Sequence, residues 1–285
     1  MSRFVYVNGA YLPEEEAKIS VFDRGFLFAD GVYEVSSVLR RKLIDNQGHL
    51  ARLHRSLGEL DMAAPASDAE IEVIQKTLIE KNNVDQGLVY LQVTRGAADR
   101  DFAYPEGVKP SLVMFTQQKN VVDSLQARTG ISVISVDDIR WRRRDIKTVG
   151  LLAPCMAKMQ AKRAGADDAW LVEDGHVTEG SSNNAFIISA EGALVTRQLG
   201  NEILAGITRK SVLKLAEEQH MKIEQRPFSV EEACNAREAF ITSATTFVMP
   251  VVSIDGNPIA DGKPGRLTQR LRELYIQAAL DSIEK

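Results

Sequence analysis

The chain has 285 residues, of which 44% are hydrophobic and 26% charged, and its formal net charge is -4. This composition excludes a disordered chain, and the negative charge argues against nonspecific binding to nucleic acid or to an anionic membrane surface. No apolar run approaches the roughly 20 residues that a membrane helix needs, so no membrane segment is expected. Only two cysteines, Cys155 and Cys234, and an acidic N-terminal stretch unlike a signal peptide indicate a cytoplasmic protein. Cys155, beside a proline in an apolar context, is expected to be a buried packing residue.

Strands and helices alternate in the first part of the chain. Leucines spaced as one face of a helix lie between residues 50 and 60. Ser67 and Glu70 form a capping-box pattern, which predicts the start of the next helix. Strands are expected at 4–7, 31–35, 88–93 and 112–115.

The polar stretch 116–120 is the expected domain boundary, which gives an N-terminal domain of residues 1–120 and a C-terminal domain of residues 121–285. Ser229 and Glu232 repeat the capping-box pattern in the second domain. Further strands are expected at 131–136, 169–172, 185–188, 239–242 and 251–254, and helices at 156–164, 208–217 and 267–280. Strands and helices mixed in two halves predict an α+β or α/β architecture.

Gly206, Ile207 and Thr208 stand where an amphipathic helix begins. Free N–H groups and the positive end of the helix dipole make such a position suited to an anion, above all a phosphate. The turn 242–246 offers hydroxyls and amides of the same kind. From the residues alone, an ordinary capped helix and an ordinary turn remain equally good interpretations.

Two further residues stand out by their surroundings. Glu179 lies in the segment 178–184, whose small hydroxyl and amide residues can aim a carboxylate at a ligand nitrogen, although the same composition favours a plain hairpin loop. Lys147 follows the basic run 140–144, which is expected to be a solvated face rather than a nucleic-acid site. If this run is a strand, Lys147 shares a face with Asp145. Spacing alone does not distinguish Lys147 from the other lysines.

Taken together, these segments resemble the class IV aminotransferases, which are the fold-type-IV pyridoxal-phosphate enzymes. The resemblance is carried, in chain order, by 23–34 (DRGFLFADGVYE), 49–53 (HLARL), 145–147 (DIK), 178–183 (TEGSSN) and 206–208 (GIT). It implies a two-domain fold with the cofactor between the domains, the larger C-terminal domain carrying the cofactor lysine. It also implies a homodimer that takes a small-molecule amino donor and a 2-oxo acid acceptor.

The resemblance assigns a role to each candidate residue. Lys147 would hold the cofactor as a Schiff base and move the proton during the reaction. The carboxylate of Glu179 would keep the pyridine nitrogen protonated, so that the ring can accept electrons. Phosphate and ring would be bound by Arg52, Gly206, Ile207, Thr208, Ala244 and Thr245, with Ser181 and Ser182 bracing them.

Within the family, the run 31–35 (GVYEV) is similar to the branch that acts on D-amino acids, with Tyr33 and Val35 facing the substrate. In that branch an arginine and, two residues later, a histidine hold the substrate carboxylate. Arg100 matches the arginine, whereas Phe102 stands at the histidine position. The leading expectation is transamination of a D-alanine-like amino acid with a 2-oxo acid such as 2-oxoglutarate.

Several alternatives on the same scaffold stay open: a branched-chain L-amino-acid aminotransferase, an (R)-amine transaminase and aminodeoxychorismate lyase. Phe102 favours a substrate without a carboxylate, and Arg100 favours a substrate with one. A noncatalytic binding protein is the alternative from another class. Lys147, Glu179 and the 206–208 motif together argue against a decayed site.

Overall fold

The computed structural model describes residues 2–284, whose contacts divide the chain into two compact units. The first unit comprises the described residues up to Asn120 together with Ile146–Gly150. The second comprises Val121–Asp145 and the described residues from Leu151 onward. Lys147 was expected in the C-terminal domain, but the short segment that carries it packs with the first unit. None of the helices in residues 2–284 has the length and apolar character needed to cross a membrane.

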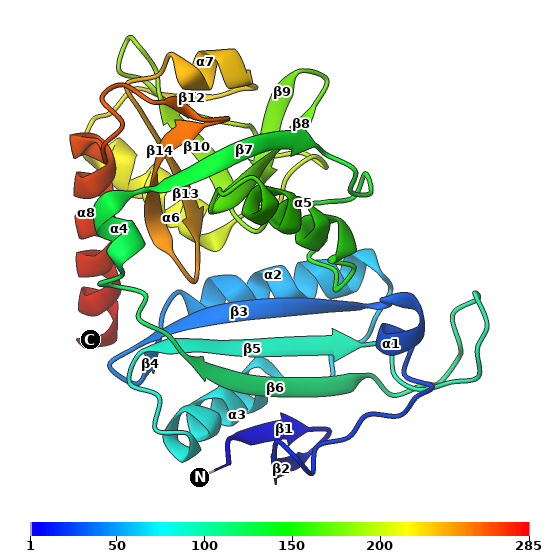
Figure 1. Ribbon diagram of the computed structural model, residues 1–285. Coiled ribbons are helices and arrows are strands. Elements are labelled where there is room, and N and C mark those ends of the chain that lie inside the picture. The colour runs from blue at the N-terminus through cyan, green and yellow to red at the C-terminus, as the bar shows by residue number, and fades with distance from the viewer. Residues whose placement is uncertain (1, 285) are drawn as a thin grey trace. The chain divides into compact units, whose positions relative to one another are not determined.

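The first unit is built on a six-stranded sheet with the strand order β2-β1-β6-β5-β3-β4 (Figure 1). Its strands are β1 (Phe4–Val7), β2 (Ala10–Pro13), β3 (Gly31–Leu39), β4 (Lys42–Leu43), β5 (Gly87–Thr94) and β6 (Ser111–Gln118). Its helices are α1 (Arg24–Phe28), α2 (Asn46–Glu59) and α3 (Asp68–Lys81). The expected strands and both expected helices are therefore present, with β3 and β6 extending past the predicted ends.

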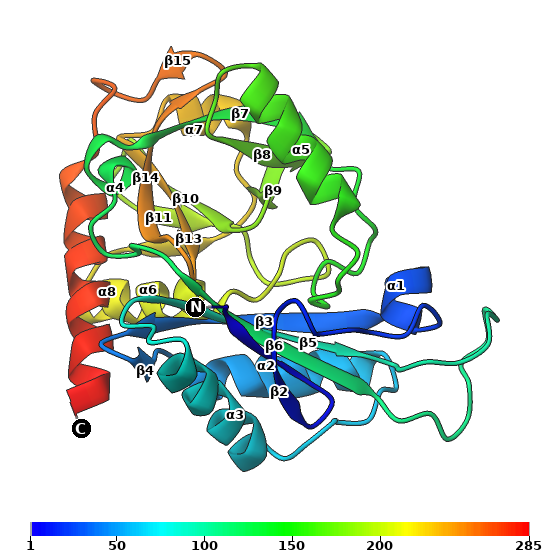
Figure 2. The same cartoon turned by 60° about the horizontal axis from the view of Figure 1, so that its bottom comes forward.

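Helices α2 and α3 cover one face of this sheet (Figure 2). Because side chains alternate along a strand, Val32, Leu91 and Met114 point to that face and pack with the leucines of α2. The opposite face carries a stacked aromatic row, Tyr33, Tyr90 and Phe115. The expected capping box at the start of α3 is confirmed, since the Ser67 and Glu70 side chains each bond the other's backbone N–H.

The segment 146–150 lies along the beginning of β3. The Tyr33 N–H donates to the Lys147 carbonyl and the Val149 N–H donates to the Gly31 carbonyl, both at 3.0 Å. No strand runs through residues 138–147, so the conditional strand over the basic run is wrong. The segment makes side-chain ion pairs instead: Arg140 pairs with Asp138, and Arg144 pairs with Glu173.

The second unit contains a nine-stranded sheet with the main order β12-β11-β10-β13-β14-β7-β8-β9 and with β15 paired to β14 (Figure 1). Its strands are β7 (Ile131–Asp137), β8 (Asp168–Glu173), β9 (His176–Gly180), β10 (Asn184–Ile188), β11 (Leu194–Thr196), β12 (Ile223–Gln225), β13 (Glu238–Ser243), β14 (Phe247–Ile254) and β15 (Asn257–Pro258). Its helices are α4 (Leu125–Thr129), α5 (Leu152–Arg163), α6 (Ile207–Glu218), α7 (Val230–Cys234) and α8 (Arg266–Glu284).

The core of the second unit is formed by apolar side chains of its central strands, among them Trp170, Ile187 and Ile241. The buried residues of α5 are Ala157 and Ala161, which pack against β7 and β8, and much of the rest of the helix is exposed. Cys155 lies in that exposed part, so the expectation of a buried cysteine is wrong.

Two local predictions in this unit also need correction. Glu179 lies on strand β9 rather than in a loop, because its neighbours pair with β8: Gly180 is opposite Trp170 and Val177 is opposite Val172. At α7, the Ser229 hydroxyl caps the helix as expected, but the Glu232 carboxylate is bound by Arg226.

Candidate active site

Lys147 is placed by the backbone bonds between its segment and β3. Its Nζ lies 4.1 Å from the centre of the Tyr33 ring. Among residues 2–284 no carboxylate forms an ion pair with this nitrogen, and the side chain is half-buried. An amine that is not held in an ion pair can act as a nucleophile once it has lost its proton.

On the other face of β3, Glu34 holds two basic residues of α2. Arg52 donates from Nε and Nη2 to the two oxygens of Glu34, each at 2.7 Å, and His49 Nδ1 lies 2.8 Å from Glu34 Oε2. All three side chains are buried. Burial opposes the charge of Glu34, but Arg52 and His49 outweigh it and lower the pKa of this carboxyl to about 2. The two-point contact fixes the orientation of the guanidinium.

Tyr33 and Val35 lie on the face of β3 opposite Glu34, as the alternation of a strand requires. The Tyr33 ring stacks on Tyr90, with 5.5 Å between ring centres, and Tyr90 stacks on Phe115 at 4.7 Å. Burial and the neighbouring Tyr33 raise the pKa of the Tyr90 hydroxyl, which donates to Gln92. Tyr33 is thus held by a packed row and is the member of it that meets Lys147.

Arg100 and Phe102 lie in the exposed segment between β5 and β6. The Arg100 guanidinium lies between two rings, 5.2 Å from the centre of Phe28 and 5.5 Å from that of Phe102. The two rings also meet each other, at 5.5 Å. Phe102 is 78% exposed, so a phenylalanine at the position of the expected histidine gives this segment an apolar surface in place of a donor.

Glu179 is the centre of a buried polar network in the second unit. Oε1 accepts from Arg140 Nη1, and Oε2 accepts from Asn184 Nδ2 at 2.9 Å and from the Leu204 N–H at 3.1 Å. Arg140 also donates to both oxygens of Asp138. A carboxylate offers about four lone-pair positions, so three donors leave Glu179 one acceptor site.

The charges of this network depend on one another. Burial is the largest effect on the Glu179 carboxyl and raises its pKa, against the opposing influence of Arg140 and the Leu204 N–H. Burial also disfavours the charge of Arg140, but the bonds from Asp138 and Glu179 outweigh it and raise the pKa of the guanidinium. Arg140 therefore stays charged, and its charge opposes the burial that raises the pKa of Glu179.

The N-terminus of α6 lies beside the same network. Gly206 is its N-cap and offers no side-chain bond to the first turn. A Cβ at Gly206 would lie 2.0 Å from Asn184 Oδ1, so only glycine permits this close approach. Thr208 and Arg209, in the first turn, are buried. The first N–H groups of α6 consequently have no capping side chain and can bind an anion.

The hairpin turn between β13 and β14 adds hydroxyl groups. Asn184 and Thr242 are directly paired across β10 and β13 and so share one face of the sheet. Thr242 Oγ1 is buried and has no hydrogen-bond partner among the described residues. Beyond it, Ser243 Oγ lies 2.8 Å from Thr246 Oγ1 and 3.4 Å from Thr245 Oγ1, and Ala244 and Thr245 are half-buried.

Ser181 and Ser182 follow Glu179 but differ in surroundings. The Ser181 hydroxyl is buried and donates to Asp168 Oδ1 at 2.5 Å, whereas Ser182 is exposed. Lys158 and Asn183 also bind Asp168. The Ser181 hydroxyl therefore braces the loop after β9 from within the unit.

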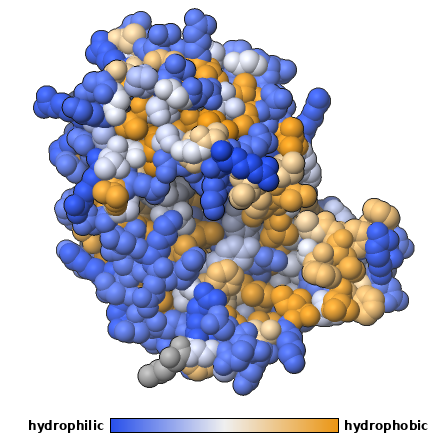
Figure 3. Space-filling model, viewed as in Figure 1, coloured by the Kyte–Doolittle hydropathy of each residue, from blue (hydrophilic) through white to orange (hydrophobic). Residues whose placement is uncertain are grey.

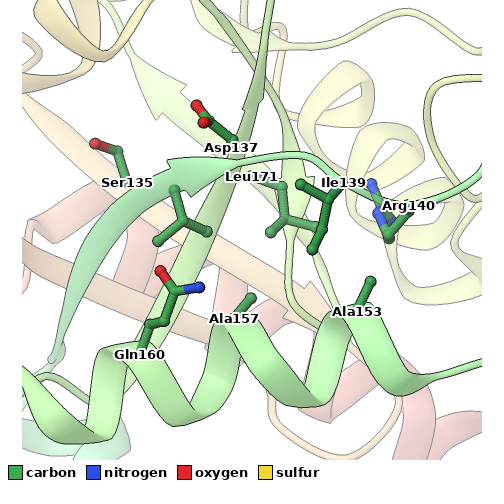
Figure 4. Close-up of a pocket in the computed structure, with 9 residues that line it drawn as sticks. Ser135, Asp137, Ile139, Arg140, Ala153, Ala157, Gln160 and Leu171 are labelled. Atoms are coloured by element: carbon green, nitrogen blue, oxygen red, sulfur yellow. The ribbon is translucent and has the colours of Figure 1, made fainter.

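A separate pocket of about 400 Å³ lies between α5 and strands β7 and β8 (Figure 4). Ala153, Ala157 and Gln160 of α5 line one side of it, and Ile139 and Leu171 line the other. Arg140 is the one residue that this pocket shares with the Glu179 network. None of the residues predicted from the sequence to bind the cofactor or the substrate lines it.

The structure adds residues that had no assigned role at the level of sequence: Glu34, His49, Asp138, Arg140 and Asn184. Glu34, His49 and Asn184 lie inside or beside the recognised motifs, so the sequence located them but gave them no role. Arg140 was taken as part of a solvated charge run. Its partners Asp138 and Glu179 are distant from each other in the sequence, and only the fold brings them together.

Comparison with known proteins finds relatives over nearly the whole chain. The family model described as amino-transferase class IV matches residues 31–254. The chain is 38% identical over 281 residues to a D-alanine aminotransferase of Bacillus licheniformis, with 99% of each chain covered. It is 36% identical over 271 residues to a D-alanine aminotransferase of Staphylococcus aureus strain MSSA476, with 94% of this chain and 95% of the relative covered.

Among solved structures, a branched-chain amino acid aminotransferase from T.th. with pyridoxamine 5'-phosphate superposes with a TM-score of 0.90. That protein is 26% identical, and the match covers 98% of this chain and 94% of the other. The match of the family model to most of the chain, together with close relatives over its whole length, identifies the family. The chain belongs to the class IV aminotransferases, which are pyridoxal-phosphate-dependent enzymes.

Proposed function

We propose that this enzyme transfers the amino group of a D-amino acid, such as D-alanine, to a 2-oxo acid, such as 2-oxoglutarate. The observation that carries the proposal is the Glu179 network beside the open N-terminus of α6. It offers one acceptor for a ring N–H and uncapped N–H groups for a phosphate. The choice of D-amino acids is supported by the D-alanine aminotransferase relatives and by the run from Gly31 to Val35.

The groups present fit pyridoxal phosphate on their chemistry. The unused acceptor site of Glu179 suits a protonated pyridine nitrogen. The Thr242 hydroxyl, which is buried without a partner among the described residues on the same sheet face as Asn184, can bond a polar atom of a ligand. For the phosphate we propose the first amides of α6, from Ile207 and Thr208 after Gly206, the Ala244–Thr245 turn and the Arg52 guanidinium. Since the Ser181 hydroxyl is engaged with Asp168, the proposed serine contact is that of Ser182.

Pyridoxal phosphate, when bound, supplies the electron sink that the reaction needs. Lys147 is proposed to hold the cofactor covalently and to carry the proton between the substrate Cα and the cofactor C4′. The Tyr33 ring limits where the Lys147 amine can move. Glu179 is proposed to accept the N–H of the ring nitrogen, and the charge of Arg140 opposes the burial that raises the pKa of Glu179. Arg100 is proposed to bind the substrate carboxylate through its two-pronged guanidinium.

A branched-chain L-amino-acid aminotransferase is the second candidate, favoured by the TM-score of 0.90 with the solved T.th. enzyme. The two activities differ in the enantiomer that enters. Purified enzyme given D-alanine and 2-oxoglutarate should form pyruvate and glutamate. Activity confined to L-leucine would reverse the assignment, and activity confined to (R)-amines would remove the role of Arg100.

The assignment of Lys147 is tested separately from the substrate. Borohydride treatment of the holoenzyme should fix the cofactor on the peptide that contains Lys147, as read by mass spectrometry. Lys147→Ala should abolish this label, and Lys158→Ala, a matched change of an exposed lysine in α5, should preserve it. A label on any other lysine, or none at all, contradicts the mechanism.

We also propose a cytoplasmic homodimer. Exposed aromatic and aliphatic side chains gather in the first unit around α1 and the segment after β5, as the orange region at the right of Figure 3 illustrates. They are Val21, Phe22, Phe26, Phe102 and Tyr104. An apolar patch of this kind favours burial against a second copy. Light scattering should give twice the mass of the 31.5 kDa chain, and a monomer at micromolar concentration would refute the proposal.

A further inference from the structure

The hairpin that joins β13 to β14 has an unusual backbone. Three residues, Ala244–Thr246, connect the two strands, and Phe247 follows them with a φ of +58°. A bulky side chain rarely adopts this left-handed conformation, because the Cβ crowds the backbone. The Phe247 ring is fully buried against Tyr275 of α8, 5.0 Å between ring centres. The surroundings must therefore hold the turn in a conformation that its own sequence disfavours.

Arg272 of α8 supplies the bonds that do so. Its Nη1 donates to the carbonyls of Thr246 and Val248, at 2.7 and 2.6 Å, which are the residues on either side of Phe247. Its Nη2 donates to the carbonyls of Val121 and Val122, both at 2.8 Å. The planar guanidinium thereby bridges both flanks of the strained residue to the first residues of the second unit.

This arrangement is not an ordinary ion pair. Arg272 is buried, and the acceptors found for it are four backbone carbonyls, with no carboxylate ion pair among residues 2–284. A lysine cannot reproduce it, because an ammonium has three N–H donors for four acceptors and lacks the planar fork of a guanidinium. Helix α8 is itself fixed one turn earlier, where the Glu238 carboxylate accepts from the Leu267 and Thr268 N–H groups.

We infer that Arg272 is a positioning residue for the cofactor phosphate, an inference that rests on the proposed function of the Ala244–Thr245 turn. By fixing the carbonyls of Thr246 and Val248, Arg272 sets the direction in which the turn presents its amides and hydroxyls. Helix α6, which supplies the other phosphate donors, packs against both α8 and β13. Helix α8 therefore fixes the position of the turn between β13 and β14 relative to the start of α6.

The test compares Arg272→Met and Arg272→Lys with the unaltered holoenzyme. The release of pyridoxal phosphate on dilution should be roughly tenfold faster in Arg272→Met. This is the effect expected when the misplaced turn loses one hydrogen bond to the charged phosphate. Arg272→Lys should fall between the two. The affinity for pyridoxal, which has no phosphate, should not change. Leu271→Ala, a buried neighbour on α8, is the control and should lower thermal stability without changing the ratio of the two affinities.

Unchanged release of pyridoxal phosphate from the folded variants, or an equal loss of affinity for pyridoxal, would overturn the inference while leaving the proposed function intact. A second measurement needs no variant. In the unaltered protein, pyridoxal phosphate should slow amide exchange at residues 244–248, and pyridoxal should not; equal protection by both ligands also overturns it. If the unaltered protein takes up no pyridoxal phosphate at all, the proposed function fails and the phosphate role of Arg272 fails with it.

Discussion

Replacing Glu34 by glutamine should destabilise the first unit and misorient Arg52. The change keeps the size of the side chain but removes the negative charge to which Arg52 and His49 are both bound. Arg52 and His49 are 8% and 3% exposed, so water cannot replace the lost partner. Glu34→Gln should therefore lower both the free energy of unfolding and, through the freed guanidinium, the affinity for pyridoxal phosphate.

The size of the destabilisation follows from the pKa of the Glu34 carboxyl. Its pKa falls from an ordinary value of 4.5 to about 2 in the folded protein, and each pH unit corresponds to about 1.4 kcal/mol. The charged form of Glu34 thus contributes about 3 kcal/mol, which agrees in size with the roughly 3–5 kcal/mol lost when one partner of a buried ion pair is removed. Because the folded pKa is the lower one, this contribution is complete above about pH 4.5 and disappears as the pH falls through about 2.

The assay is urea unfolding of both proteins in the same cofactor state, between about pH 7 and about pH 3. The difference in unfolding free energy should stay constant near neutral pH and shrink below about pH 4.5. Glu70→Gln, at the exposed capping box of α3, serves as the control. The bonds from Ser67 lower the pKa of this exposed carboxyl as well, so its acid dependence should have the same sign but be much smaller than that of Glu34→Gln. A difference below about 1 kcal/mol at neutral pH, or one that grows toward acid, would refute the reasoning.

Three further changes test separate parts of the structure. Arg140→Met removes the cation that opposes the raised pKa of Glu179, so that pKa should rise further. The acid limb of the profile of activity against pH should then move to higher pH. Arg142→Met, a change of an exposed neighbour, should leave this profile in place. Phe102→His restores a donor beside Arg100 and should lower the KM for D-alanine by roughly tenfold with little change in kcat, measured in steady-state assays. Ser67→Ala removes the N-cap of α3 and should cost about 1 kcal/mol in urea unfolding, with no change in KM.

Local signals in the sequence were sufficient for most elements. The leucine stripe predicted α2, and the Ser67 capping box predicted the start of α3, because both depend on residues three or four apart in one helix. The start of α6 at Gly206 was likewise readable, and the prediction that it binds an anion depends only on the free N–H groups that every helix N-terminus carries. Elements of two to five residues, such as β4 and α4, are too short for a periodic pattern to be recognised.

The motifs of this chain, read in order, determined its family and indicated Lys147 as the cofactor lysine, because covalent and helix-end chemistry is encoded in neighbouring residues. The partners of each charge were decided by the tertiary structure alone. Arg140 binds Asp138 and Glu179, Glu34 binds Arg52, and Arg272 binds the carbonyls beside Phe247. A buried charge is stable only where the fold brings its counterpart within hydrogen-bond distance, and residues far apart in sequence give no local sign of that meeting.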